Sequence, residues 1–470
     1  MMLLALALAL PVLAGWAITG WLRPWPGSSA VERGGRLAAS ALAGIGLSSV
    51  TTFCWLLAGG SIGRLHAFAD ALLLGSIAVA GMVGRRARPG GTGAPPPSPR
   101  LDRAAAAAMA AALLVAIGCV SALGVATPHG EADGWMMWNL RARFLLRAGE
   151  AWPVAFAPEL GWTSTEYPLL LPLAIARLWG YAGEAAPAPA ALALVFAAAA
   201  PLALAASAGA AAGTWRGAAA GLLLLATPGY VTLAASQYAD VPLAAFLVAG
   251  VGAAAGAGRR AGRGPPGSLL AAGLFLGLAG WTKNEGVAAA ALVTVMHGIW
   301  AWRGGGPRAA FRNAALIATG ALVPAAAWLV FHAIVTPRVS GVLFMGHTPG
   351  SVAASLADLH RWAVVARGLL GGLPGLRIGF PAAVVATAVV LAGRGRGGLE
   401  PRTLVLAGLL LALDAGVFMM TRWDLEWHLR LSADRLVLQA WPVLLLGLLS
   451  GSAAVRGGGS EGGATPAAGG

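Results

Sequence analysis

The stretch AAAAAMAAALLVAIGCVSALGVA at residues 104–126 decides the fold class, because it is uncharged and long enough to cross a bilayer as one helix. About 20 consecutive apolar residues span a hydrocarbon core of about 30 Å. Similar runs recur along the whole chain of 470 residues, of which 58% are hydrophobic and only 11% are charged. Soluble globular proteins carry about 25% charged residues, so the composition excludes that class. The sequence predicts an all-α, polytopic transmembrane helical bundle.

The apolar runs and the polar or Pro/Gly segments between them predict about thirteen membrane spans. They lie near 3–22, 37–59, 66–84, 104–126, 188–211, 217–235, 240–257, 267–283, 286–302, 313–335, 378–392, 403–420 and 435–451. The apolar segment 168–182 is short and contains two prolines and an arginine. We therefore expect it to be re-entrant or interfacial.

The distribution of charge predicts the orientation of these spans. The connection 85–103 holds five Arg and one Asp, and it is placed in the cytoplasm by the positive-inside rule. The alternation of the spans then assigns 19 of the 32 basic residues, but only four of the 18 acidic ones, to cytoplasmic segments. Much of the net charge of +14 is thereby explained by topology, and we expect a lipid bilayer rather than a nucleic acid as the partner.

The predicted organisation has five parts. They are the N-terminal spans and cytoplasmic linker (1–103), a catalytic membrane module (104–335) whose first outer loop is 127–187, a second long outer loop (336–377), the C-terminal spans with a last outer loop rich in Arg and His (378–451), and a disordered tail (452–470). Both long outer loops contain amphipathic stretches that predict interfacial helices. Long connections of this kind are usually functional.

Carboxylates gather at the predicted outer ends of the spans. Glu131 and Asp133 directly follow the span 104–126 and could supply a general base and its supporting group, although paired carboxylates in a loop can also be merely solvated. Glu166 and Tyr167 precede a proline, which favours an extended or turn geometry. Asp240 begins the span 240–257, where it could act in chemistry, cap the helix, or do both.

Two further outer segments carry candidate anion-binding groups. Lys283, followed by Asn284, is the single lysine among the 32 basic residues. Its compact ammonium favours contact with a phosphate. The alternative is that this side chain only extends along the membrane interface to keep its charge in water. The last outer loop contributes His428, Arg430 and Arg435 before the final span. These groups favour an anion site, and a solvated loop with internal salt bridges is the alternative.

The order of these motifs resembles the GT-C membrane glycosyltransferases, over residues 104–451. The similarity is greatest to bacterial members that are protein-mannosyltransferase-like or aminoarabinose-transferase-like. The resemblance rests on the carboxylate pair, the TEYP element (165–168), the aspartate of SQYAD (236–240), the TK pair (282–283) and the Arg/His loop. It implies transfer of a sugar from a polyprenyl-phosphate carrier to a glycan, lipid or protein at the outer face of the inner membrane.

The resemblance also implies roles for individual residues. Asp133 would be the catalytic base, with Glu131 supporting it, and Lys283 would bind the donor phosphate. The other expected substrate-binding residues are Glu166, Tyr167, Asp240, Asn284, His428, Arg430 and Arg435. Glu131, Asp133 and Asp240 are the side chains that would hold a divalent cation, although the sequence does not require one.

Two other classes remain open from the sequence. A transporter or flippase of lipid-linked sugars would place its rare polar residues near the membrane midplane, whereas here they collect at one face. An enzyme that resembles O-antigen ligases or polymerases would share the membrane architecture and the lipid carrier, but would depend on Arg and His more than on an early acidic pair.

Overall fold

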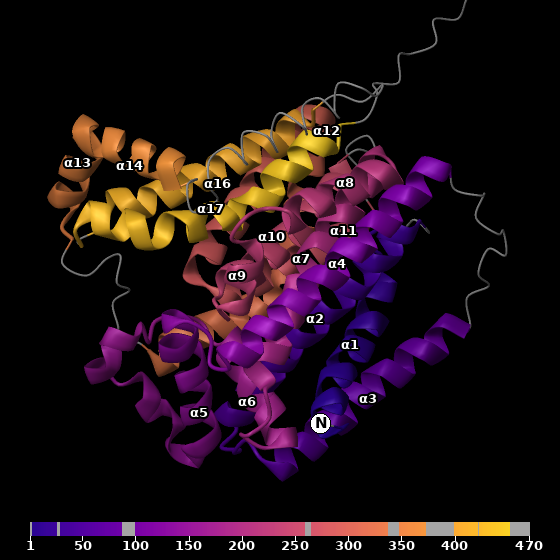
Figure 1. The fold of residues 1–470 in the computed structure, drawn as a ribbon, viewed down its shortest axis with the longest axis vertical. Helices are drawn as coiled ribbons and strands as arrows, with labels where there is room; N and C mark the ends of the chain where they lie inside the picture. Colours follow the sequence, from indigo (N-terminus) through magenta and orange to yellow (C-terminus); the bar gives the residue numbers. More distant parts are fainter. Residues whose placement is uncertain are drawn as a thin grey trace, which may run out of the picture.

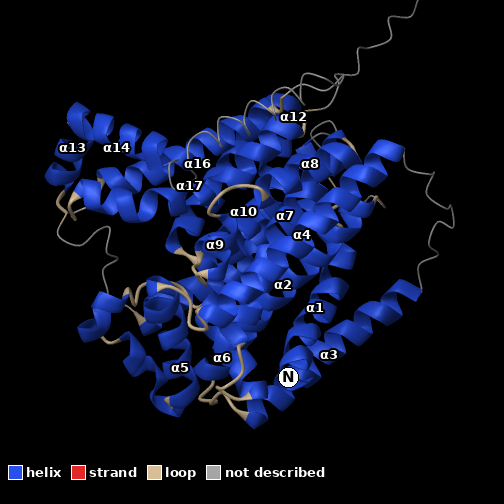
Figure 2. Cartoon of the chain, in the orientation of Figure 1, coloured by secondary structure: helices blue, strands red, loops and turns tan. Residues whose placement is uncertain are grey.

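The computed structural model describes residues 2–25, 29–86, 99–258, 265–336, 347–372, 399–421 and 423–451. Within these residues every regular element is a helix (Figures 1 and 2). Nine of the described helices are long and apolar enough to cross a membrane. The described part of the chain is therefore all-helical and has the helices of a multi-pass membrane protein, and the predicted span 378–392 lies outside it.

The first four helices are α1 (Met2–Leu22), α2 (Ala30–Leu57), α3 (Arg64–Arg86) and α4 (Arg100–Ala126). A capping box between Ser29 and Glu32 starts α2 earlier than the apolar run alone predicts. Gly44 lets α2 pack directly on α1, because a Cβ at this position would clash with the Pro11 carbonyl. Small residues allow such close helix contacts in membranes.

The first predicted outer loop is a folded substructure. A π-helix (Gly134–Asn139), α5 (Leu140–Arg147) and two 3-10 helices (Gly149–Phe156 and Pro158–Thr163) lead into α6 (Leu170–Ala182). Helix α6 is too short to cross a bilayer, and it is buried from Leu170 to Trp179. Its Arg177 forms an ion pair of 2.6 Å with Asp70 of α3, so the bundle interior holds both charges as a pair.

The next helices are α7 (Ala188–Ala212), α8 (Thr214–Leu225), α9 (Tyr230–Ala235) and α10 (Asp240–Gly258). The single span predicted at 217–235 is wrong, because the chain breaks between α8 and α9. Pro228 lacks an amide hydrogen and Gly229 takes a positive φ of 82°, which together end one helix and start another.

Helix α11 (Pro266–Thr282) leads into α12 (Asn284–Val330), which continues as a π-helix (Phe331–Val335). Gly306, with φ 76°, interrupts the helical conformation of α12. Trp328 Nε1 donates to Asn284 Oδ1 (3.1 Å), so the two halves fold back on each other as a hairpin. These halves correspond to the predicted spans 286–302 and 313–335.

The last described helices are α13 (Pro349–Ala357), α14 (Leu359–Gly372), α16 (Pro401–Met419) and α17 (Leu425–Leu449). Helix α14 packs on α16 and α17 (Figure 1), and Arg361 of α14 donates to the carbonyls of Phe418, Met419 and Thr421 at the end of α16. The predicted last loop is wrong, because the final helix begins at Leu425, ten residues before the predicted position. Asp424 is its N-cap, and its side chain accepts a hydrogen bond from Trp427 N (2.8 Å).

Candidate functional site

Four segments that are distant in sequence meet in a chain of alternating charges. It runs from Asp133 to Arg435, Asp240, Lys283 and Glu285, and we call these five side chains the ion-pair chain. They come from the segment after α4, the middle of α17, the first residue of α10 and the junction of α11 with α12. The structure therefore brings together residues of four separate sequence candidates: the predicted first outer loop, the SQYAD aspartate, the unique lysine and the last Arg/His segment.

Asp240 is the centre of this chain and is fully buried. Its Oδ1 accepts hydrogen bonds from Lys283 Nζ (3.2 Å) and Gln439 Nε2 (2.6 Å), and its Oδ2 accepts one from Arg435 Nε (3.0 Å). The position of Asp240 at the start of α10 stabilises its ionised carboxylate, because the N-terminal end of a helix dipole is positive. Asp240 thus organises the cations around it and offers no exposed oxygen for chemistry.

Lys283 lies where α11 ends, in an extended conformation with φ −148°. Its ammonium is bonded to Asp240 and to Glu285 Oε1 (3.1 Å), and lies 5.8 Å from the centroid of the Tyr167 ring. Burial opposes the charge of Lys283, but the two carboxylates outweigh it and raise its pKa above the ordinary value. Lys283 is therefore a permanent cation at physiological pH.

Arg435 and Gln439 reach Asp240 together because they are four residues apart on one face of α17. Arg435 also binds Asp133 Oδ2 at 2.6 Å, and its guanidinium lies 4.2 Å from the centroid of the Tyr238 ring. Burial, followed by the Asp133 carboxylate, raises the pKa of Tyr238.

Exposure differs sharply along the ion-pair chain. The Asp133 side chain is 26% exposed, whereas Arg435 is 18%, Lys283 6% and Asp240 0% exposed. A ligand can therefore reach Asp133 most easily, and can reach the cations only from that side or through a cavity.

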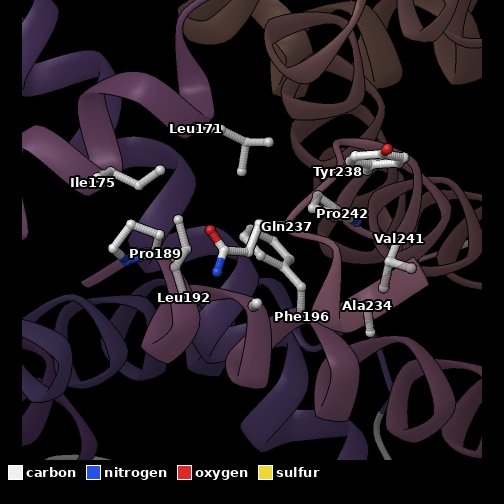
Figure 3. A pocket seen from close by; sticks show the side chains of 11 residues that line it. Leu171, Ile175, Pro189, Leu192, Phe196, Ala234, Gln237, Tyr238, Val241 and Pro242 are labelled. Atoms are coloured by element: carbon white, nitrogen blue, oxygen red, sulfur yellow. The ribbon is translucent and has the colours of Figure 1, made fainter. Parts of the chain in front are cut away.

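The segment that carries Asp133 is held against the start of α10. Gln237, with a positive φ of 61°, accepts from Asn139 Nδ2 (2.6 Å), and Glu131 N donates to Ser236 O (3.1 Å). In Figure 3, Gln237 and Tyr238 point to different sides of their segment. The small pocket that they help to line has only about 20 Å³, which is room for about one water molecule. It is a packing feature and not a substrate site.

The TEYP element and Asn284 also lie beside the ion-pair chain. The Tyr167 hydroxyl donates to Glu285 Oε1 (3.4 Å), and burial together with the Glu285 carboxylate raises the pKa of Tyr167. Asn284 Nδ2 donates to the carbonyl of Glu166 (3.2 Å). Glu166 itself is buried near Arg141; burial lowers the pKa of Arg141 to about 10 and this carboxylate opposes the shift. Tyr167 and Asn284 thus connect the TEYP element to the junction of α11 with α12.

Three predicted site residues lie apart from the ion-pair chain. The Glu131 side chain is exposed. His428 bonds to Thr421 Oγ1 (2.9 Å) and packs on the rings of Phe418 and Trp423. Arg430, whose side chain is 68% exposed, lies 3.6 Å from Glu426 on the far side of α17. Because α17 is helical here, Arg430 and Arg435 cannot present the joint anion site that a loop would allow.

A metal site at the three expected carboxylates is not supported by their geometry. Within the described residues, no three His, Cys, Asp or Glu side chains are placed to share an ion. Asp133 and Asp240 are instead bridged by Arg435, whose charge takes the position that a cation would need.

A cavity of about 330 Å³ opens directly beside the ion-pair chain. Gln439, Glu285 and Asn284 contribute to its polar wall, and α10, α12, α16 and α17 form the rest. That remainder is mainly aliphatic, with Leu356 of α13 closing one side. Asp414 of α16 also lines the cavity, and the cations Lys283 and Arg435 lie behind its wall, where Lys283 pairs with Glu285, and Arg435 pairs with the Asp240 carboxylate that Gln439 also contacts.

Sequence reasoning missed three members of this site. Glu285 lies two residues after Lys283, Gln439 lies one helical turn after Arg435, and Tyr238 lies two residues before Asp240. The predicted span 435–451 already places Arg435 and Gln439 one helical turn apart on one face, so this i,i+4 spacing could have identified Gln439.

No family model, curated protein or solved structure matches the chain.

Proposed function

We propose that this protein is an integral-membrane glycosyltransferase that moves a hexose or pentose from a polyprenyl-phosphate carrier to an acceptor hydroxyl on a glycan, lipid or protein. The reaction would take place at the outer face of the inner membrane. The observation that carries the proposal is the contact between the ion-pair chain and the aliphatic cavity. A prenyl phosphate requires such a combination, because its phosphate is anionic and its chain is apolar.

In the proposed step the acceptor oxygen attacks the anomeric carbon of the donor. The new C–O bond forms as the bond between the anomeric carbon and the phosphate oxygen breaks, and the bonding electrons leave with the phosphate. Asp133 takes the proton of the acceptor hydroxyl. Arg435 and Lys283 stabilise the charge of the departing phosphate, so no second carboxylic acid is required to protonate it.

The contacts of Arg435 suggest how donor binding and the base are linked. Arg435 is shared by Asp133 and Asp240, and Asp133 is the more exposed of the two partners. A phosphate that pairs with Arg435 Nη2 would replace Asp133 at that nitrogen. The carboxylate of Asp133 would then be free to accept a proton. Asp240 would keep Arg435 in place through Nε throughout.

The test is protein-dependent release of prenyl phosphate in proteoliposomes. A panel of isoprenyl-phosphate hexoses and pentoses is supplied with detergent-solubilised envelope lipids as acceptors, and the products are measured by liquid chromatography and mass spectrometry. We expect Asp133→Asn to lose at least 100-fold in rate, within the range that general-base catalysis supplies.

The matched control is Glu426→Gln, which changes an exposed carboxylate on α17 far from the cavity. It should retain the wild-type rate. Wild-type activity in Asp133→Asn, or no protein-dependent release with any member of the panel, would refute the proposed function.

A further inference from the structure

A second cavity, of about 220 Å³, lies at the other end of the bundle from the ion-pair chain. Its wall comes from the second half of α10, from both halves of α12 beside the Gly306 interruption, and from the first turns of α16. His297, one of its lining residues, lies 13 residues after the start of α12, which is about 20 Å along a helix. The two cavities have no described lining residue in common.

Two buried polar side chains of this second cavity form a pair. Asn313 Nδ2 lies 3.4 Å from His297 Nε2, and the two residues are 2% and 6% exposed. Arg312 Nη1 donates to Asn313 Oδ1 (3.4 Å), which assigns the amide nitrogen to the side of the histidine. Because Asn313 then donates to Nε2, the neutral imidazole carries its proton on Nδ1. Within the described residues His297 Nδ1 has no hydrogen-bond partner, so the cavity holds a donor that a ligand can use.

Arg402 supplies positive charge to the same cavity. The carboxylate beside it in the wall, Glu400, accepts from Thr403 N (2.6 Å) and caps α16. Arg402 itself is exposed and has no ion pair with a described residue. It interacts electrostatically with His297, so one ligand can reach both groups. A guanidinium presents a fork of N–H donors that fits two oxygens of one phosphate.

The rest of the wall favours a lipid as the carrier of that phosphate. It is mainly apolar and includes Trp300 and Leu406. The cavity lies between three helices that are candidate membrane spans, at the end where Arg303 and Arg308 predict the cytoplasmic leaflet. Basic pockets between membrane helices on that side bind the head groups of anionic lipids. A small soluble phosphate would leave the apolar wall uncovered.

We propose that this cavity binds the phosphate group of an anionic glycerophospholipid from the leaflet at this end of the bundle. Arg402 pairs with the phosphate oxygens, His297 Nδ1 donates to a further oxygen of the head group, and the apolar wall contacts the start of the acyl chains. The bound lipid holds α10, α12 and α16 together and is not a reactant. The proposal therefore does not rest on the proposed function.

Binding is tested with dioctanoyl phosphatidylglycerol and dioctanoyl phosphatidylcholine, which share the phosphate and the acyl chains and differ in net charge. Purified protein in dodecyl maltoside is heated with graded amounts of each lipid, and unfolding is followed by tryptophan fluorescence. A ligand that binds only the folded state stabilises it once its concentration exceeds the Kd. We expect phosphatidylglycerol to bind at least tenfold more tightly than phosphatidylcholine. Equal binding of the two lipids would overturn the proposal.

Two charge variants separate the cavity from the basic surface around it. Arg402→Gln removes the charge of the cavity wall, and Arg308→Gln removes the same charge from an exposed arginine that does not line the cavity. Arg402→Gln should lower the affinity for phosphatidylglycerol at least tenfold, whereas Arg308→Gln should change it less than twofold. Equal losses in the two variants would indicate diffuse attraction and would overturn the site, as would an undiminished affinity in Arg402→Gln.

A third variant and a soluble probe test the cavity itself. Ala255→Leu adds volume to the cavity wall from α10 without changing charge, and it should also lower the affinity for phosphatidylglycerol at least tenfold. Wild-type affinity in this variant would place the lipid elsewhere and refute the assignment. Glycerol 1-phosphate, which lacks acyl chains, should bind at least tenfold more weakly than phosphatidylglycerol. Equal binding of these two would assign the site to a soluble phosphate ester and overturn the lipid as ligand.

Discussion

Asp133 and Asp240 share one arginine but should respond very differently to loss of charge. The perturbation is Asp133→Asn compared with Asp240→Asn, each of which replaces a carboxylate by an amide of the same shape. Asp240 is fully buried and accepts from Lys283, Arg435 and Gln439. An asparagine there would present an NH₂ group to donors that require an acceptor.

The magnitudes follow from burial. Removing one partner of a buried ion pair costs about 3–5 kcal/mol, because the other charge stays buried without compensation. The Asp133 side chain is 26% exposed and has one ion pair to Arg435, so its loss should cost about 0–1 kcal/mol. The two variants should thus differ by about 3 kcal/mol, or more than a hundredfold in the folding equilibrium.

The assay is unfolding in mixed micelles of dodecyl maltoside with an increasing fraction of dodecyl sulfate, read by the fluorescence of buried tryptophans such as Trp281. Asp240→Asn should unfold at a clearly lower fraction of dodecyl sulfate than the wild type. Asp133→Asn should unfold close to the wild type and yet be inactive in sugar transfer. If the two variants unfold at the same fraction, the division into an organising and a reactive carboxylate is refuted.

Three other predictions concern Lys283, the buried pair below the site, and orientation. Lys283→Ala should reduce binding of prenyl phosphate at least tenfold in a lipid-overlay or calorimetric assay. Because the pKa of Lys283 is raised in the folded state, its contribution to stability is complete up to about pH 10 and is lost only as the pH rises further. Unfolding measured from pH 6 to 9 should therefore show no titration of this group. Asp70→Asn should cost about 3–5 kcal/mol in the same micelle assay by stranding Arg177, while folded molecules keep their transfer rate. In a background without the native cysteines, Glu426→Cys should react with an impermeant maleimide in intact cells and Gly304→Cys only after permeabilisation; the reverse pattern would contradict the proposed orientation.

The helical class and the approximate positions of most of the described helices could be predicted from sequence, because apolar runs of sufficient length have few alternatives in a bilayer. The errors arose where short polar signals decide a boundary. Pro228 and Gly229 split one expected span into α8 and α9. Asp424 starts α17 early, so that charged residues occupy its first turns.

The site was predictable only as a set of separate candidates. The composition of the chain indicated Lys283 as a candidate, because it is the single lysine. The position of Asp240 at the start of a predicted span indicated that residue. The sequence contains no local signal that Arg435 reaches across from α17 to Asp133, because this contact joins segments about 300 residues apart. Three-dimensional packing alone separates Arg435, which joins the ion-pair chain, from Arg430, which faces away from it.

The structure also changes the reason for a lysine at position 283. The sequence favours phosphate contact, and that remains a prediction. In the structure the ammonium lies between Asp240 and Glu285, at 3.2 Å and 3.1 Å. A compact charge with three donors fits this space, whereas the planar fork of an arginine, which prefers bidentate partners, would have to displace one of the carboxylates. Lys283 therefore links the organising carboxylate of α10 to the cavity wall, and any phosphate that it binds must approach from the side of the ammonium that these two carboxylates leave open.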